Sequence, residues 1–116
     1  MLPINDSLTL TVKHRNIAMN WLLDTYPNAF DLRNRQPLKT HILKDIFQQA
    51  LANQPSQEAL TSAFSYYTLW GSYLNALTEG AACIDLNGFP CGNISKQEAS
   101  LAIERLKFAE KKFSGE

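Results

Sequence analysis

The chain has 116 residues, a length that fits one compact domain with a buried core and is too short for two. Its 45% hydrophobic and 19% charged residues are typical of a soluble globular protein, and no apolar run approaches the roughly 18 to 20 residues that span a bilayer. The formal net charge is zero, so any affinity for nucleic acid has to come from how the charges are distributed.

The amino-terminal segment lacks the features of an export signal. MLPINDSLTLTVKHR carries acidic and polar residues where a signal peptide has a basic region followed by an apolar one. Two cysteines are also too few for a disulfide scaffold, so a reducing cytoplasm is the expected location. We expect residues 1–9 to be a flexible start, residues 10–113 to form a single domain and residues 114–116 to form a tail.

Two helices are predicted in the first half of the chain. From Leu10 to Tyr26 the apolar residues recur with a helical period, and Pro27 marks the end. A loop follows, and a second helix is predicted to begin near Pro37, because proline suits the first turn of a helix. Its amino end would offer free amides to an anion.

A third helix is predicted to follow an N-cap at Ser56, and a short fourth helix covers about residues 71–77. An Asn-Gly dipeptide at residues 87 and 88 then predicts a β-hairpin, because both residues tolerate positive φ. Ser95 and Glu98 have the spacing of a capping box and predict the start of a last helix. The predicted fold is therefore mostly α, with about five helices and one β-hairpin before the last helix.

The stretch SYYTLWGSYL, residues 65–74, holds four aromatic side chains, which cannot all face one core. The structural interpretation buries Tyr67 and Trp70 and leaves Tyr66 and Tyr73 half-exposed. The functional interpretation is that an exposed tyrosine stacks on a nucleotide or donates its hydroxyl to it. The residues alone leave both interpretations open.

The two cysteines, Cys83 and Cys91, are expected to be small buried side chains. A zinc site needs about four ligands in close pairs, a spacing that these cysteines and the two distant histidines do not have. A disulfide would need a hairpin register that sets them opposite each other and an oxidising compartment. A catalytic cysteine needs a nearby base, whereas the neighbouring titratable residue is Asp85. A hairpin that responds to thiol oxidation is a weaker alternative.

No signature of an enzyme is present. The sequence contains no P-loop, no nucleophile elbow, no zinc-protease helix and no dinucleotide-binding glycine motif. We therefore expect no catalysis, no cofactor, no metal and no small-molecule substrate.

Positive charge is concentrated in two segments. Between residues 33 and 44 the chain carries basic side chains and no acidic one: Arg33, Arg35, Lys39, His41 and Lys44. A second group lies near the carboxyl end: Arg105, Lys107, Lys111 and Lys112. One interpretation is two solvated helix faces. The other is a basic patch that follows a phosphate backbone.

An ordered set of short stretches resembles the ProQ/FinO family of bacterial RNA chaperones. In chain order these are Tyr26-Pro27-Asn28-Ala29-Phe30, Pro37-Leu38-Lys39, Asp45-Ile46, Tyr67-Thr68, Tyr73-Leu74, Gly80-Ala81, Asp85-Leu86-Asn87-Gly88 and Gly92. The resemblance covers about residues 21–106. It implies a FinO-type domain that binds structured RNA, such as a terminator hairpin with a single-stranded 3′ tail, in regulation through small RNAs or mRNA 3′ ends. The alternative is a protein-interaction module on the same scaffold.

The resemblance also implies which residues contact RNA. Lys39 matches the lysine that follows Pro-Leu, Asp45 the acid on the same helix, and Tyr73 the tyrosine of the 3′-end pocket. Arg35 stands one place before the usual arginine, and Cys83 occupies the position of the hairpin arginine. Other positions that are often arginine in the family hold Thr61, Ser65 and Ser72. The expected surface comprises Arg33, Arg35, Lys39, His41, Lys44, Asp45, Tyr73, Cys83 and Asp85. The protein is expected to act as a monomer and away from membranes.

Overall fold

The computed structural model describes the backbone of residues 3–113 and the side chains of residues 12–108, so the expected tail at residues 114–116 lies outside the described residues. Its elements follow in the order α1 (Pro3–Thr25), α2 (Ile42–Gln49), α3 (Gln57–Leu69), α4 (Gly71–Leu74), β1 (Ala82–Ile84), β2 (Pro90–Asn93) and α5 (Lys96–Phe113). Within residues 3–113, five helices and a hairpin placed before the last helix confirm the predicted fold class.

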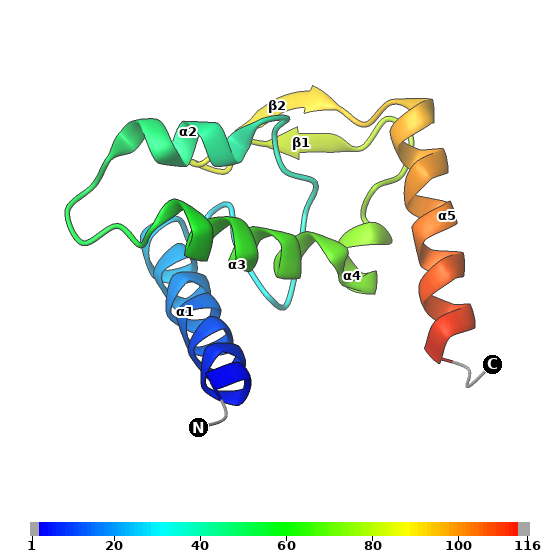
Figure 1. The fold of residues 1–116 in the computed structure, drawn as a ribbon. Coiled ribbons are helices and arrows are strands. Elements are labelled where there is room, and N and C mark those ends of the chain that lie inside the picture. Colours follow the sequence, from blue (N-terminus) through cyan, green and yellow to red (C-terminus); the bar gives the residue numbers. More distant parts are fainter. Residues whose placement is uncertain (1–2, 114–116) are drawn as a thin grey trace.

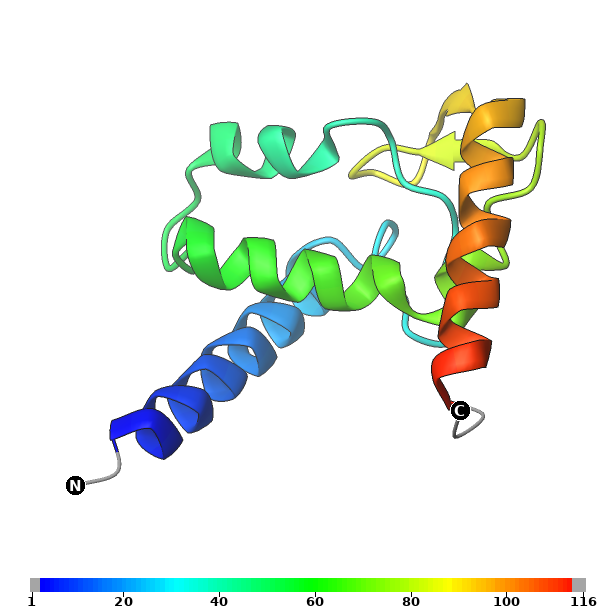
Figure 2. The same ribbon diagram turned by 45° about the vertical axis from the view of Figure 1, so that its right-hand side comes forward.

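The helix α3 lies at the centre of the fold. Figure 1 shows α1 crossing on one side of it, with α2 and the hairpin on the other side. Figure 2 shows α5 standing at the hairpin end of the molecule, away from the start of α1. The core forms where these elements meet α3, and its fully buried side chains include Ala18, Leu22, Ile42, Ile46, Leu60, Ala63 and Tyr67.

The helix α1 begins at Pro3, seven residues before the predicted start at Leu10. Proline at a first helical position is favourable because its missing amide hydrogen has no partner to lose there. The helix ends at Thr25, two residues before Pro27, as predicted. It therefore includes residues 3–9, which belong to the segment 1–9 that was expected to be a flexible start.

Residues 37–41 form no helix, and the predicted start of the second helix at Pro37 is wrong. Leu38 forms an isolated parallel bridge with Ile84 of β1. The Lys39 amide donates to the Ile84 carbonyl at 2.8 Å, and the Ile84 amide donates to the Pro37 carbonyl at 2.9 Å. This long-range pairing satisfies the backbone of the segment, so α2 begins only at Ile42, after His41 with φ 63°.

The burial of the aromatic stretch differs from the structural interpretation at two of its four positions. Tyr67 is buried and Tyr66 is 37% exposed, as expected, but Trp70 is 50% exposed and Tyr73 only 7%. The reason is that α3 ends at Leu69 and Trp70 has extended backbone angles, φ −74° and ψ 149°. The helical phase therefore restarts at α4, which turns Tyr73 inward.

The hairpin has one irregularity, next to the cysteines. Ala82 pairs with Asn93 and Ile84 pairs with Pro90, so two residues of β2, Cys91 and Gly92, stand opposite the single residue Cys83. This is the pattern of a β-bulge. Both cysteines are free. Cys83 is buried, as expected, whereas Cys91 is only partly buried.

The turn of the hairpin spans residues 85–89 and is organised by Asp85. One carboxylate oxygen of Asp85 accepts from the amides of Asn87 at 2.9 Å and Phe89 at 3.0 Å. Gly88 has φ 84°, a left-handed conformation that favours glycine. The Asn-Gly signal therefore marks the hairpin correctly, although the loop is longer than two residues.

Both predicted helix caps are present. The Ser56 hydroxyl accepts from the Ala59 amide at 3.1 Å at the start of α3. The Ser95 hydroxyl accepts from the Glu98 amide at 3.1 Å, while the Glu98 carboxylate accepts from the Ser95 amide at 2.8 Å. This reciprocal pair is a capping box and confirms the predicted start of α5.

Candidate functional site

Two hollows meet at Lys39, one on each side of its side chain. The first, called here the α5 groove, lies between residues 38–41, α3 and α5 and has a volume of about 300 Å³. The second, called here the α2 pocket, lies between α2 and the hairpin turn and has a volume of about 310 Å³. Lys39 lines both of them.

The α5 groove is lined by more basic than acidic side chains. Its basic residues are Lys39, His41 and Arg105, and its acidic residue is Glu98. The rest of its wall is mostly apolar and includes Phe64. A cationic rim over an apolar wall suits an anion that carries a flat or apolar group, such as a nucleotide.

The α2 pocket has the opposite balance of charge. Two carboxylates, Asp45 and Asp85, line it together with the single cation Lys39, and the remaining polar groups are neutral: Tyr26, Gln48, Gln49 and Asn87. Carboxylates and amides exchange hydrogen bonds with hydroxyl groups and base edges. A phosphate would be repelled here, whereas a sugar would not.

Lys39 and Asp45 form an ion pair between the two hollows. The Lys39 ammonium lies 2.7 Å from a carboxylate oxygen of Asp45, and both side chains remain about one third exposed. The hydrogen bond and the charge of Asp45 raise the pKa of Lys39, so the ammonium stays protonated. The sequence placed both residues on one helix, whereas Lys39 lies three residues before the start of α2.

Tyr26 contributes a hydroxyl that the sequence interpretation did not single out. This oxygen is buried and has no hydrogen-bond partner in the described structure, and burial raises the pKa of the phenol. Because this oxygen is buried, a ligand in the α2 pocket pairs with it only if the surrounding wall moves. Tyr26 and Asn87 belong to stretches that carried the family resemblance, and Arg105 belongs to the second basic segment. Gln48 and Gln49 had no signal in the sequence.

Tyr73 lines the α5 groove and contacts the segment that carries Lys39. Its hydroxyl accepts from the Leu38 amide at 3.1 Å, which ties α4 to the segment that carries Lys39. Burial raises the pKa of Tyr73, so its phenol stays neutral. Because the side chain is only 7% exposed, the ring offers little face for stacking, and the hydroxyl positions Leu38.

The basic segment from Arg33 to Lys44 does not form one continuous wall. Figure 1 shows the loop between α1 and α2 passing behind α3, reaching beyond it and rising to the hairpin. Arg35 packs on the Tyr67 ring at 4.9 Å and donates to the Tyr67 carbonyl at 3.2 Å. Lys39 and His41 line the α5 groove instead. Arg33 and Lys44 are exposed and line neither hollow.

Two further predicted site residues, Cys83 and Asp85, hold structural positions in the hairpin. Cys83 is 5% exposed and lines neither hollow, and burial is the main cause that raises the pKa of its thiol. Asp85 lines the α2 pocket, but one of its oxygens already accepts the two amides of the turn.

The amino end of α2 offers less to an anion than the sequence indicated. The Ile42 amide already donates to the Lys39 carbonyl, and the Lys44 amide donates to the His41 carbonyl. Asp45 also stands in the first turn of the helix and competes with an external anion for the helix dipole.

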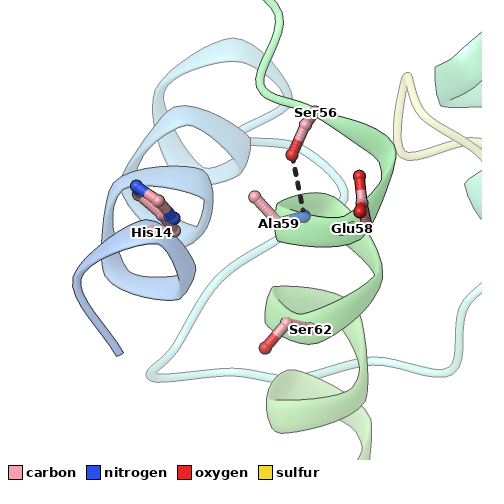
Figure 3. A pocket seen from close by; sticks show the side chains of 5 residues that line it. All are labelled: His14, Ser56, Glu58, Ala59 and Ser62. Atoms are coloured by element: carbon pink, nitrogen blue, oxygen red, sulfur yellow. Dashed lines mark hydrogen bonds between the residues drawn. The ribbon is translucent and has the colours of Figure 1, made fainter. Parts of the chain in front are cut away.

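A third hollow, between α1 and α3, gathers residue types that hydrolases use. Figure 3 shows His14 of α1 across from Ser56, Glu58, Ala59 and Ser62 at the start of α3. The Ser56 hydroxyl is occupied by the cap, and no hydrogen bond joins His14 to a serine or to Glu58 among the described residues. The arrangement therefore lacks the contacts of a catalytic triad.

The described part of the chain contains neither a cluster of metal ligands nor a helix that could span a membrane. Among its residues no three side chains of metal-ligating type come together. None of its helices combines the length and the apolar character needed to cross a membrane.

Comparison with known proteins points to one family. A family model described as the ProQ/FINO family matches residues 12–115. The solution structure of a ProQ homolog from Legionella pneumophila is 30% identical, over 76% of each chain, with a TM-score of 0.63. The crystal structure of a FinO-like RNA chaperone from Neisseria meningitidis MC58 has the same fold, with 18% identity, a TM-score of 0.62 and coverage of 98% of this chain and 96% of that one.

Proposed function

Because the chain belongs to the ProQ/FinO family, we propose that it is an RNA chaperone that binds structured RNA, in the form of a stem with a single-stranded 3′ tail, without catalysing a reaction. The structural relatives support this proposal, since one is described as a ProQ homolog and the other as a FinO-like RNA chaperone. In this proposal the protein acts as a monomer in the cytoplasm. Its ligands are small RNAs or mRNA 3′ ends, which it protects at the 3′ end or brings together with other strands.

The observation that carries the proposal is the difference in charge between the two hollows that Lys39 lines. Phosphates of the tail bind in the α5 groove, where Lys39, His41 and Arg105 outnumber Glu98. The last ribose enters the α2 pocket and donates a hydroxyl to Asp45. Only a chain end fits this arrangement, because a further phosphate beyond that ribose would face two carboxylates at short range.

The stem is recognised by shape. The deep and narrow major groove of A-form RNA hides the base edges from side chains, so contacts to phosphates and 2′-hydroxyls dominate. Exposed cations that line neither hollow, Arg33 and Lys44, are the candidates for these contacts.

A titration with a labelled terminator hairpin tests the proposal. The hairpin is compared with and without its single-stranded tail, and with a free 3′-hydroxyl or a 3′-phosphate, at several salt concentrations. If about four phosphates are neutralised, log affinity falls against log salt with a slope of about −3. We expect the free 3′-hydroxyl to bind more tightly, and equal binding of both ends would contradict the role of the α2 pocket.

Charge variants test whether RNA binding depends on the α5 groove or on the rest of the surface. We expect Lys39→Glu to weaken binding of every RNA and to flatten the salt slope by about one unit. Lys107→Glu makes the same charge change on an exposed position of α5 that lines neither hollow, and is expected to have a small effect. Purified protein that carries RNA, seen as a raised 260/280 absorbance ratio that RNase abolishes, would further argue against a protein-interaction module.

A further inference from the structure

A cluster of aromatic and cationic side chains lies on the α1 side of α3. The Arg15 guanidinium lies 4.2 Å from the centre of the Tyr66 ring, and Arg35 lies 5.8 Å from the centre of the Trp70 ring. The Tyr66 and Trp70 rings meet edge to face with their centres 5.4 Å apart. We call these four residues the Trp70 cluster.

The rings of this cluster are open to a ligand. Trp70 is 50% exposed and Tyr66 is 37% exposed, although the core side of the same helix buries Tyr67 completely. A hollow of about 310 Å³ lies beside the rings and is lined by Asn16, Met19, Asn20, Leu32, Arg35, Tyr66 and Trp70. Exposed rings next to a hollow offer faces on which a flat group can stack.

The charge of the cluster is not compensated by carboxylates. No acidic residue lines the hollow, and neither Arg15 nor Arg35 belongs to an ion pair among the described residues. Both guanidiniums are held on aromatic rings, and the Nε atom of each is buried without a hydrogen-bond partner in the same set of residues. Two fixed positive charges beside exposed rings favour an anion that also carries aromatic groups.

We propose that the Trp70 cluster is a second nucleic-acid site, in which bases of a single-stranded RNA segment stack on Trp70 and Tyr66 while neighbouring phosphates bind Arg15 and Arg35. The amides of Asn16 and Asn20 pair with base edges in the hollow. This inference rests on the proposed function in so far as the ligand is RNA, but it uses residues that line neither the α5 groove nor the α2 pocket.

The two sites bind different segments of an RNA because they lie on opposite faces of α3. Phe64 and Thr68 of α3 line the α5 groove, whereas Tyr66 follows Phe64 by two positions, which is about 200° around a helix. Trp70 follows the last residue of α3 and lines the same hollow as Tyr66. Lys39 and the proposed position of the 3′ tail lie on the face of the α5 groove. The Trp70 cluster therefore takes an unpaired segment elsewhere in the RNA, such as the flank on the 5′ side of the stem.

Tryptophan fluorescence tests the second site directly. The chain has two tryptophans, so Trp21→Phe leaves Trp70 as the single emitter. We expect a short unstructured oligouridine or oligoadenylate to quench this emission in a saturable and salt-dependent manner. Trp70→Ala is expected to weaken binding of the same oligonucleotide roughly 5- to 150-fold, the loss that corresponds to one stacked base.

Two control variants distinguish stacking from a loss of structure. Trp70→Phe keeps an aromatic face and is expected to retain most of the affinity, with a thermal unfolding midpoint close to that of the parent protein. Phe108→Ala removes another exposed ring, on α5, which does not line the hollow, and is expected to leave oligonucleotide binding unchanged.

The outcomes separate this inference from the proposed function. If Trp70→Ala weakens the oligonucleotide but not a terminator hairpin that has only a 3′ tail, the second site is supported. Unchanged Trp70 emission at saturating oligonucleotide overturns the second site, while a hairpin that still responds to Lys39→Glu leaves the proposed function in place. Failure of every RNA to bind overturns both. Crosslinks from the Trp70 cluster to protein and not to RNA would overturn the second site in favour of a protein partner.

Discussion

At Tyr73 a single hydroxyl connects two parts of the chain that are 35 residues apart. It accepts from the Leu38 amide at 3.1 Å, in a place where both residues are buried. Because the bond is buried, removing the acceptor leaves the Leu38 amide without a partner, so the contact contributes more than a typical exposed hydrogen bond. The position of Lys39, next to Leu38, depends on it.

We therefore expect Tyr73→Phe to lower the free energy of unfolding by about 1–3 kcal/mol, the cost of leaving a buried donor without a partner. Tyr66→Phe removes the same atom from an exposed tyrosine and is expected to change stability by less than about 0.5 kcal/mol. Urea unfolding of both variants measures the difference. Equal effects would mean that the Tyr73 hydroxyl does not hold Leu38 in place.

The elements show which features local sequence can predict. Ser56, Ser95 and Glu98 act on amides within three residues, so their roles as caps follow from spacing alone. Pro37 gave a local signal of the same kind, but the backbone around it pairs with Ile84, which lies 47 positions away. A contact at that separation leaves no trace in a local pattern, and the predicted helix start was wrong for that reason.

The hairpin turn and the turn that follows α1 fit together at Gly88. A Cβ atom added there would lie 2.9 Å from the Asn28 Cβ and 3.0 Å from the Asn28 carbonyl oxygen, and the backbone has φ 84°. Gly80 has a similar φ of 86° but no atom within 4 Å of an added Cβ. The two glycines therefore separate the cost of the backbone conformation from the cost of the contact.

We expect Gly80→Ala to destabilise the protein by about 1–2 kcal/mol, because a left-handed conformation strains a residue with a Cβ. Gly88→Ala is expected to cost a further 1 to 3 kcal/mol or so, since Asn28 and the hairpin turn must move apart. Thermal or urea unfolding of the two variants gives the comparison. If they lose the same stability, the contact with Asn28 contributes nothing.

At the scale of the whole molecule, the path of the loop between α1 and α2 places its basic side chains on different faces. Arg35 and Lys39 are four positions apart, yet one packs on Tyr67 at the α1 side of α3 and the other lines the α5 groove. The sequence shows which residues of this segment are basic. It could not show that the segment passes from one face of the molecule to the other, since that path depends on how α3 packs.

The path of this loop and the break between α3 and α4 explain which parts of the site the sequence did not predict. Asp45 and Lys39 were expected near Tyr73, and Lys39 does lie beside it through Leu38, but Asp45 faces the α2 pocket. One of the two interpretations of the aromatic stretch placed Trp70 in the core. The break between α3 and α4 changed the phase, and the ring became part of a surface.

Buried tyrosines make the stability of the whole molecule sensitive to alkaline pH. Burial is the main cause that raises the pKa of Tyr67 and Tyr73 above the usual value of about 10. The unfolded chain, in which these phenols are solvated, therefore loses its protons at a lower pH than the folded chain. Their contribution to stability is complete below about pH 10 and is lost as the pH rises through the folded-state pKa values.

We expect the free energy of unfolding, measured with urea at a series of pH values from about 8 to 11, to fall steeply above about pH 10. The variants Tyr67→Phe and Tyr73→Phe cannot ionise at these positions, so each is less stable at neutral pH but loses less stability per pH unit in the alkaline range. Tyr66→Phe, at an exposed position, serves as the matched control and is expected to keep the slope of the parent protein. An alkaline slope that none of the three variants changes would show that burial of Tyr67 and Tyr73 does not link folding to their protonation.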